Sequence, residues 1–142
     1  MGPGMEEIVR GVFEERLIDN PYYDNEKQVV VAVYAGAELS LQLYLTLNGE
    51  SEAINTELLE RKASVVRAMG CGCPEALGKI EAMGLDIKDL VRDGTRFLGA
   101  SPVMRHGEMV GIVAVSGQDH EGFDQPASEL IADALAERAP VS

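Results

Sequence analysis

A histidine among carboxylates is the densest group of reactive side chains in the sequence. In the stretch "QDHEGFDQP", His120 is accompanied by Asp119, Glu121 and Asp124. One imidazole and three carboxylates form a set that can ligate a divalent metal ion. A solvated loop of an acidic protein explains the same residues and is the favoured interpretation. A metal-dependent enzyme that uses Asp119, His120 and Glu121 therefore stands as a secondary alternative.

A second candidate group is the adjacent pair Arg61 and Lys62 in "LLERKASVV". On a helix the two side chains point about 100° apart, and Lys62 lies one turn from Leu58 and Val66, close to the apolar stripe. A lysine in that position either extends to solvent or pairs with a carboxylate or a ligand anion. Spacing alone leaves both interpretations open.

The remaining motifs carry weaker indications of chemistry. His106 stands beside Gly107 in a polar turn, where a polar residue is expected in any case. Cys71 and Cys73 are too close for a comfortable disulfide with each other and lack the spacing of a zinc site. The sequence contains neither a Gly-x-Ser-x-Gly nucleophile frame nor a phosphate-binding loop.

Length and charge narrow the class of protein. The 142 residues fit one domain, and 24 acidic against 12 basic side chains give a net charge of −12. Such a chain is a poor binder of nucleic acid or of anionic membrane surfaces. No apolar run approaches the roughly 18 residues of a membrane span, and two cysteines cannot build a disulfide framework. We expect one cytoplasmic domain over residues 5–142, preceded by an expression remnant at 1–4.

Hydrophobic periodicity predicts the elements of the first half. A helix is expected in "EEIVRGVFEERLI", followed by "QVVVAVYA", a strand buried on both faces. In "LSLQLYLTLN" leucines alternate with polar residues, which predicts a strand whose dry face holds Leu41, Leu43, Leu45 and Leu47. A longer helix, capped by Ser51 and ended at Gly70, is predicted with a buried stripe of Ile54, Leu58, Val65, Val66 and Met69.

The second half predicts two short helices, a hairpin and a last helix. Pro74 opens a helix that ends at Gly84, and a turn or two of helix surrounds Ile87. The hairpin is "PVMRHGEMVGIVAVSG", with His106 at its turn, and the last helix is "DQPASELIADALAER". In the second hairpin strand Met109, Gly111, Val113 and Val115 share one apolar face and the intervening residues share another, so this strand should be central. Gly117 is expected to leave the sheet at positive φ.

The order of these elements predicts an α+β domain. Two hairpins separated by helices favour a single, mainly antiparallel sheet of four or five strands with helices on one or both faces. That is a profilin-like or PAS-like outline.

The helix "RKASVV", the segment "GASPVMRHGEMVGIVAVSG" and the helix "DQPASELIADAL" together resemble the GlcG/HbpS-like family, also called the haem-degrading-domain family. Members typically carry a central-helix lysine, a Gly- and Pro-containing strand and a second strand ending in Val-Ser-Gly. Lys62, Gly99, Pro102 and the residues up to Gly117 match these features, and the Arg-Lys pair resembles one branch of the family. The resemblance implies a profilin-like α/β/α sandwich that forms homo-oligomers. Some members of the family bind haem.

From this resemblance we expect a small-ligand-binding protein whose ligand is haem, a related tetrapyrrole or an organic anion. Arg61 and Lys62 would be the partners of an anionic group, and His106 and Ser116 would be polar groups of the pocket. Side chains able to ligate haem iron are His106, Met104, Tyr44 and His120. The alternative is an oligomeric structural or interaction module without a small ligand, with "LSLQLYLTLN" as its assembly surface.

Overall fold

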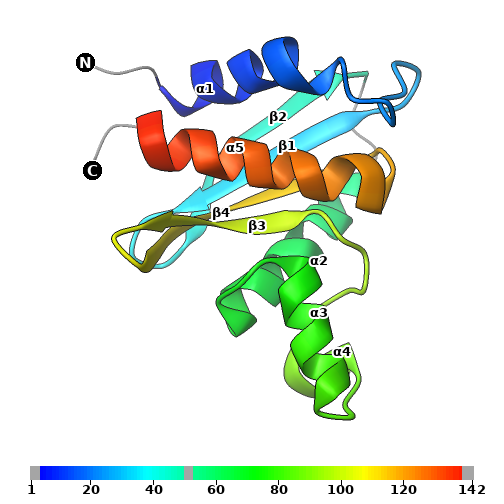
Figure 1. Ribbon diagram of the computed structural model, residues 1–142, viewed down its shortest axis with the longest axis vertical. Helices are drawn as coiled ribbons and strands as arrows, with labels where there is room; N and C mark the ends of the chain where they lie inside the picture. Colours follow the sequence, from blue (N-terminus) through cyan, green and yellow to red (C-terminus); the bar gives the residue numbers. More distant parts are fainter. Residues whose placement is uncertain (1–3, 50–52, 139–142) are drawn as a thin grey trace.

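A four-stranded antiparallel sheet forms the centre of the fold. The computed structural model describes residues 4–49 and 53–138. The strands are β1 (Val29–Ala35), β2 (Ser40–Asn48), β3 (Ala100–Arg105) and β4 (Glu108–Ser116), in the order β2-β1-β4-β3. All neighbouring pairs are antiparallel, and the two hairpins meet where β1 pairs with β4 (Figure 1). The α+β class and the four-stranded form of the predicted sheet are confirmed.

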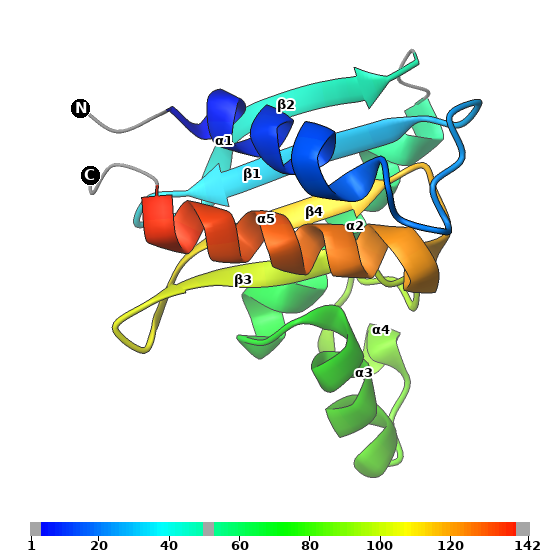
Figure 2. The ribbon, with the colours of Figure 1, turned by 45° about the horizontal axis from the view of Figure 1, so that its top comes forward.

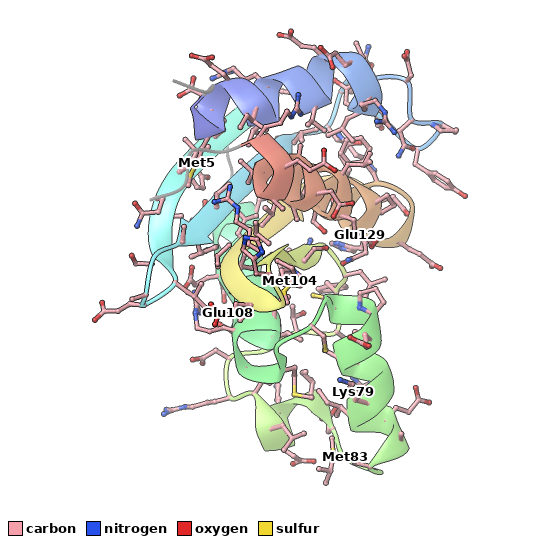
Figure 3. The ribbon with its side chains drawn as sticks, turned by 60° about the vertical axis from the view of Figure 1, so that its left-hand side comes forward. Met5, Lys79, Met83, Met104, Glu108 and Glu129 are labelled. Carbon is pink, nitrogen blue, oxygen red and sulfur yellow. The ribbon has the colours of Figure 1, made fainter. Side chains whose placement is uncertain are left out.

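Helices cover both faces of this sheet. One face carries α1 (Met5–Val12), its π-helical continuation η1 (Phe13–Leu17) and α5 (Gln125–Arg138), with α1 and α5 side by side (Figure 2). The other face carries α2 (Ala53–Met69). Next to α2, α3 (Cys73–Ala82) and α4 (Ile87–Leu90) extend away from the sheet, and Met83 lies near the far tip of that extension (Figure 3). The architecture is the α/β/α sandwich that the resemblance implied.

The two central strands are buried on both faces, as their composition predicts. Along β1, Val31 packs into the core under α1 and α5, whereas Val30 and Ala32 pack into the core under α2. In β4, Val113 and Ile112 divide between the same two cores. The prediction that β4 is central is therefore confirmed.

The predicted alternation of side chains between the two faces of β4 is wrong at the start of the strand. Met109 packs with the α2-side core and Val110 with the opposite core, the reverse of the expected assignment. The cause is a β-bulge, because Val103 pairs with Gly111 and the next residue of β3, Met104, pairs with Met109. The extra residue, Val110, exchanges the two faces locally.

The leucine face of β2 is less buried than predicted. Leu45 is buried, but Leu41 is 53% exposed. Because β2 is an edge strand, it has a neighbouring strand on one side only, and the core that takes in Leu45 does not extend to Leu41.

The central helix α2 buries a stripe with a lysine in it. Its buried residues include Leu59, Lys62, Ala63 and Val66, at helical spacing. Leu58 is only half-buried, so the stripe is turned slightly from the one predicted. Ser51 and the side chain of Ile54, both assigned to this helix from sequence, lie outside the described part of the chain, as do residues 1–3 of the expected remnant.

Candidate functional site: a buried lysine beneath His120

Lys62 reaches from α2 to the exit of β4, where three groups surround its ammonium. Nζ donates a hydrogen bond to the carbonyl oxygen of Val115 at 2.8 Å. It also lies 3.3 Å from Asp124 Oδ2 and 3.3 Å from Nδ1 of His120. The side chains of Lys62 and Asp124 are both 0% exposed. A fully buried ion pair thus lies against the inner ring nitrogen, Nδ1, of His120.

Burial sets the electrostatics of this group. Removal from water lowers the pKa of Lys62, and the negative charge of Asp124 opposes that shift without cancelling it. Beside Lys62, the thiol of Cys73 lies 3.8 Å from the Lys62 carbonyl oxygen. Burial raises the pKa of Cys73 to about 11, so this thiol stays protonated at neutral pH.

Gly99 makes room for the lysine. Its φ is +137°, and a Cβ at this position would lie 2.5 Å from the Val115 oxygen and 2.7 Å from Lys62 Nζ. Gly99 is fixed on both sides, because its carbonyl oxygen accepts from the Val115 N–H and its own N–H donates to Gln125 Oε1. A side chain here would displace the ammonium from Val115.

A π-helical turn, η2 (His120–Asp124), places the imidazole over the ion pair. The Asp119 carboxylate caps this turn by accepting from the Gly122 N–H at 2.6 Å. The Asp124 N–H donates to the Asp119 carbonyl oxygen at 2.8 Å, which closes the wide turn. His120 and Asp124 consequently share one face, with His120 Nδ1 3.3 Å from Asp124 Oδ2.

The outer side of His120 is aromatic and reaches solvent. The His120 side chain is 35% exposed, and its ring stacks on Phe97 with centroids 4.5 Å apart. Tyr22 lies against Gly122 of the same turn, since a Cβ on Gly122 would come within 2.4 Å of the Tyr22 ring. Phe97 is 49% exposed and Tyr22 61% exposed. Because Nδ1 faces two buried groups, Nε2 belongs to the outer edge of the ring.

The structure joins residues that the sequence had assigned to separate groups. Lys62, expected among anion partners, meets His120 and Asp124, expected among metal ligands. Ser116 is buried next to this group, and its Oγ donates to Asn55 Oδ1 at 3.3 Å. Arg61 instead points to solvent and pairs with Glu57 at 2.7 Å.

The other predicted site residues lie elsewhere. His106 sits at the tip of the β3–β4 hairpin with φ of +52°, a conformation that a turn histidine tolerates. The hairpin lies at the opposite end of the sheet from the start of α5 (Figure 1), and eight residue steps along β4 correspond to about 25 Å. Met104 is in the same hairpin, close to Glu108 in Figure 3. Tyr44 lies on β2, where its hydroxyl is 2.9 Å from Thr56 Oγ1.

The predicted metal cluster is not assembled. Of its four residues, only His120 and Asp124 are brought together, whereas Asp119 caps the turn and Glu121 is exposed. Within residues 4–49 and 53–138, no three His, Cys, Asp or Glu side chains are placed to hold a metal ion. In the same part of the chain, no helix has the length and apolar character needed to cross a membrane.

Sequence reasoning selected neither Phe97 nor Tyr22, and it named Gly99 only as a feature of the family resemblance, not as part of a site. The two aromatic residues lie in loops without periodicity, and only their exposure marks them. Gly99 adjoins the Pro102 strand of the resemblance, and that position was the available signal.

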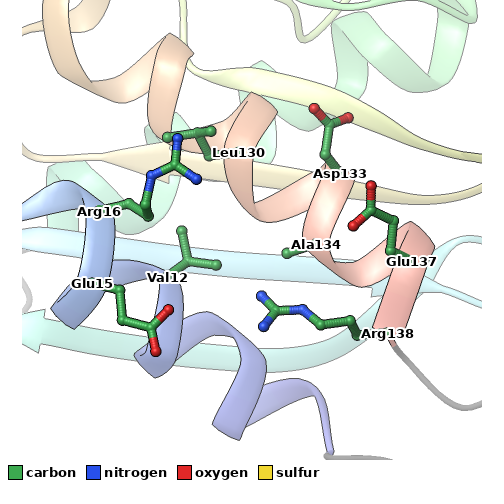
Figure 4. A pocket seen from close by; sticks show the side chains of 8 residues that line it. All are labelled: Val12, Glu15, Arg16, Leu130, Asp133, Ala134, Glu137 and Arg138. Carbon is green, nitrogen blue, oxygen red and sulfur yellow. The ribbon is translucent and has the colours of Figure 1, made fainter.

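A groove between α5 and the segment formed by η1 and the end of α1 is distinct from this site. It has a volume of about 430 Å³ and is lined largely by charged residues: Glu15, Arg16, Asp133, Glu137 and Arg138 (Figure 4). Figure 4 shows arginines and acids from both helices around it, and no residue of the Lys62 group lines it.

Comparisons with known proteins agree with this fold. Several solved structures resemble the chain. One is PduOC in complex with haem, with a TM-score of 0.66 and 18% identity, covering 92% of this chain and 88% of that one. Others are the Klebsiella pneumoniae protein ORFY, with a TM-score of 0.67 and 20% identity, covering 93% and 85%, and a double mutant of Streptomyces reticuli HbpS, with a TM-score of 0.60 and 20% identity, covering 96% and 86%. A search of curated sequences gives no significant match.

The family comparison covers most of the domain. The profile described as haem degrading protein HbpS-like matches residues 19–132. This range includes the central sheet, Lys62 and the turn that carries His120. The chain therefore belongs to the HbpS-like family.

Proposed function

We propose that this protein binds haem or a related iron tetrapyrrole, with His120 Nε2 as an axial ligand of the iron. The observation that carries the proposal is the two-sided setting of His120. Its inner nitrogen lies 3.3 Å from a buried carboxylate, and its side chain is 35% exposed. Histidines that ligate metals characteristically direct the second ring nitrogen to such a partner, which fixes the ring orientation.

The surroundings of His120 suit a flat, largely apolar ligand. Haem pockets combine one axial side chain with apolar or aromatic walls. Phe97 stacks on His120 and Tyr22 contacts Gly122, and both are exposed, so they are available to a ligand. When bound, haem would supply a redox-active iron, and the chain would orient the imidazole that holds it. Membership of the HbpS-like family and the likeness to PduOC, solved with haem, support this choice of ligand.

An organic anion held by Arg61 and Lys62 is a weaker candidate. Lys62 is fully buried and already has Val115, Asp124 and His120 around its ammonium. Arg61 pairs with Glu57 on the solvent side of the helix. A ligand anion would have to displace these partners, so we assign the ligand to His120 instead.

Haemin titration of three proteins tests the proposal. Wild type and His106→Ala should both give a shifted Soret band that saturates at one haemin per chain, whereas His120→Ala should lose the histidine-ligated spectrum. His106 is a matched control because the sequence contains only two histidines. Equal spectra for wild type and His120→Ala, or no spectral change with wild type, would refute the assignment.

A second proposal, assembly of identical chains through β2, rests on the edge of the sheet. β2 spans nine residues without a charged side chain, in a protein of net charge −12. Leu41 and Tyr44 are exposed on it. Open sheet edges usually carry charges or proline, and an uncharged edge favours pairing with another strand. Light scattering of wild type beside Leu41→Asp and Tyr44→Glu tests this proposal. Wild type should have a mass above that of the monomer, and the mass should fall in both variants. A monomeric wild type, or variants with the mass of wild type, would exclude β2 as the assembly surface.

A further inference from the structure

Lys62 and Asp124 make opposite demands on one nitrogen of His120. Nδ1 lies 3.3 Å from Lys62 Nζ and 3.3 Å from Asp124 Oδ2. An ammonium only donates hydrogen bonds, and a carboxylate only accepts them. Nδ1 can therefore accept from Lys62 as a bare nitrogen, or donate to Asp124 as N–H, but it cannot do both.

We infer that Lys62 holds His120 in the tautomer that cannot bind iron, and that Asp124 stabilises the tautomer that can. The inference rests on the proposed function, because it concerns the nitrogen that would ligate the haem. In a neutral imidazole the proton absent from Nδ1 is carried by Nε2. An Nε2 that carries a proton has no lone pair for a metal.

The hydrogen-bond inventory favours the non-binding tautomer in the ligand-free protein. Lys62 has three N–H donors and three neighbouring acceptors: the Val115 oxygen, Asp124 Oδ2 and His120 Nδ1. If Nδ1 carries the proton, two donors face each other and one buried ammonium N–H loses its acceptor, which is unfavourable. Asp124 also accepts from the Gln118 N–H through Oδ1 at 3.3 Å, so its position does not depend on the imidazole.

Binding of the iron would then require a change of tautomer. The proton on Nε2 would leave to water and one proton would be taken up from water at Nδ1, so that the net charge of the ring is unchanged and Nε2 would be free to hold the iron. Nδ1–H then donates to Asp124 Oδ2. Lys62 and Asp124 are thus positioning residues that act on the ligand through His120.

The ring nitrogens of the ligand-free protein test this directly. In long-range ¹H–¹⁵N spectra at about pH 8, above the ordinary imidazole pKa of about 6.5, we expect His120 to carry its proton on Nε2. In Lys62→Met the proton should move to Nδ1, because Asp124 is then the dominant partner, while Asp124→Asn should keep it on Nε2. His106, at the far end of the sheet, gives an internal reference whose tautomer should not respond to either substitution.

Haemin affinity gives the second readout, with opposite signs for the two variants. Lys62→Met should bind haemin about three- to tenfold more tightly, the equivalent of one hydrogen bond, and Asp124→Asn about tenfold more weakly. A merely structural role of the pair would weaken binding in both. An Nδ1–H tautomer in ligand-free wild type would overturn the inference whether or not Lys62→Met folds. Failure of haemin to bind would refute the proposed function and leave the ring measurement to decide the inference.

Discussion

Replacement of Asp124 by asparagine tests whether Lys62 depends on a buried counter-charge. The substitution keeps the shape of the side chain and removes the carboxylate that lies 3.3 Å from Lys62 Nζ. Loss of one member of a buried ion pair leaves an uncompensated charge and costs about 3–5 kcal/mol of unfolding free energy. Because 3.3 Å is long for a charge-assisted hydrogen bond and Lys62 keeps the Val115 carbonyl at 2.8 Å, we expect a loss near the lower end, about 3 kcal/mol.

The double variant Lys62→Met/Asp124→Asn separates this explanation from a simple packing defect. It removes both charges, and methionine fills much of the volume of the lysine stem. Neutral replacements of buried ion pairs are often tolerated, so the double variant should be more stable than Asp124→Asn alone. Urea unfolding followed by circular dichroism measures wild type, the single variants Lys62→Met and Asp124→Asn, and the double variant. Arg61→Ala, which breaks the exposed pair with Glu57, is the control and should change stability by no more than about 0.5 kcal/mol. A loss below about 1 kcal/mol for Asp124→Asn, or a double variant as unstable as the two single losses added together, would refute the reasoning.

Three further substitutions test the surroundings of the site. Burial raises the pKa of Cys73 from 9.0 to about 11, so between these pH values the native state keeps a thiol proton that the unfolded chain releases. As the pH rises from 9 to 11, wild type should therefore lose about 2–3 kcal/mol of unfolding free energy that Cys73→Ala does not lose. Urea unfolding at several pH values measures this difference. Gly117→Ala should cost about 2–4 kcal/mol, because φ is +111° and the new Cβ would meet the Gln28 oxygen at 2.3 Å; Gly78→Ala, with open space around it, is the control and should not destabilise the helix. Gly122→Ala should displace the exposed Tyr22 ring, change stability by less than about 1 kcal/mol and weaken haemin binding; unchanged affinity would remove Tyr22 from the site.

Much of the fold follows from side-chain periodicity. The run of β-branched residues from Val29 predicts a strand covered on both faces, and the apolar faces of β4 predict its central position. The side-chain pattern predicted the wrong orientation or burial where strand pairing, or the extent of the neighbouring core, determines the outcome. The bulge at Val110 depends on how β3 and β4 pair, and the exposure of Leu41 depends on how far the neighbouring core extends along an edge strand.

Only part of the site could be predicted from the sequence. Helical spacing places Lys62 near the buried stripe, where a lysine needs a partner, but the partner is 62 residues away, at Asp124. The segment around His120 has the composition of a loop, and only the Asp119 cap and the wide turn bring His120 and Asp124 to one face. Tertiary contacts of this kind leave no periodic signal in a single sequence.

The most direct test of the central claim is the response of the two histidine rings to a diamagnetic metalloporphyrin. Zinc protoporphyrin accepts one axial nitrogen ligand and leaves the ¹⁵N resonances of the protein observable. The proposed site predicts that Nε2 of His120 shifts in proportion to the bound porphyrin and that its Nδ1 takes up the proton, while both nitrogens of His106 stay unchanged. A shift confined to His106, or porphyrin binding that leaves both rings unaltered, would contradict the assignment of His120 as the axial ligand.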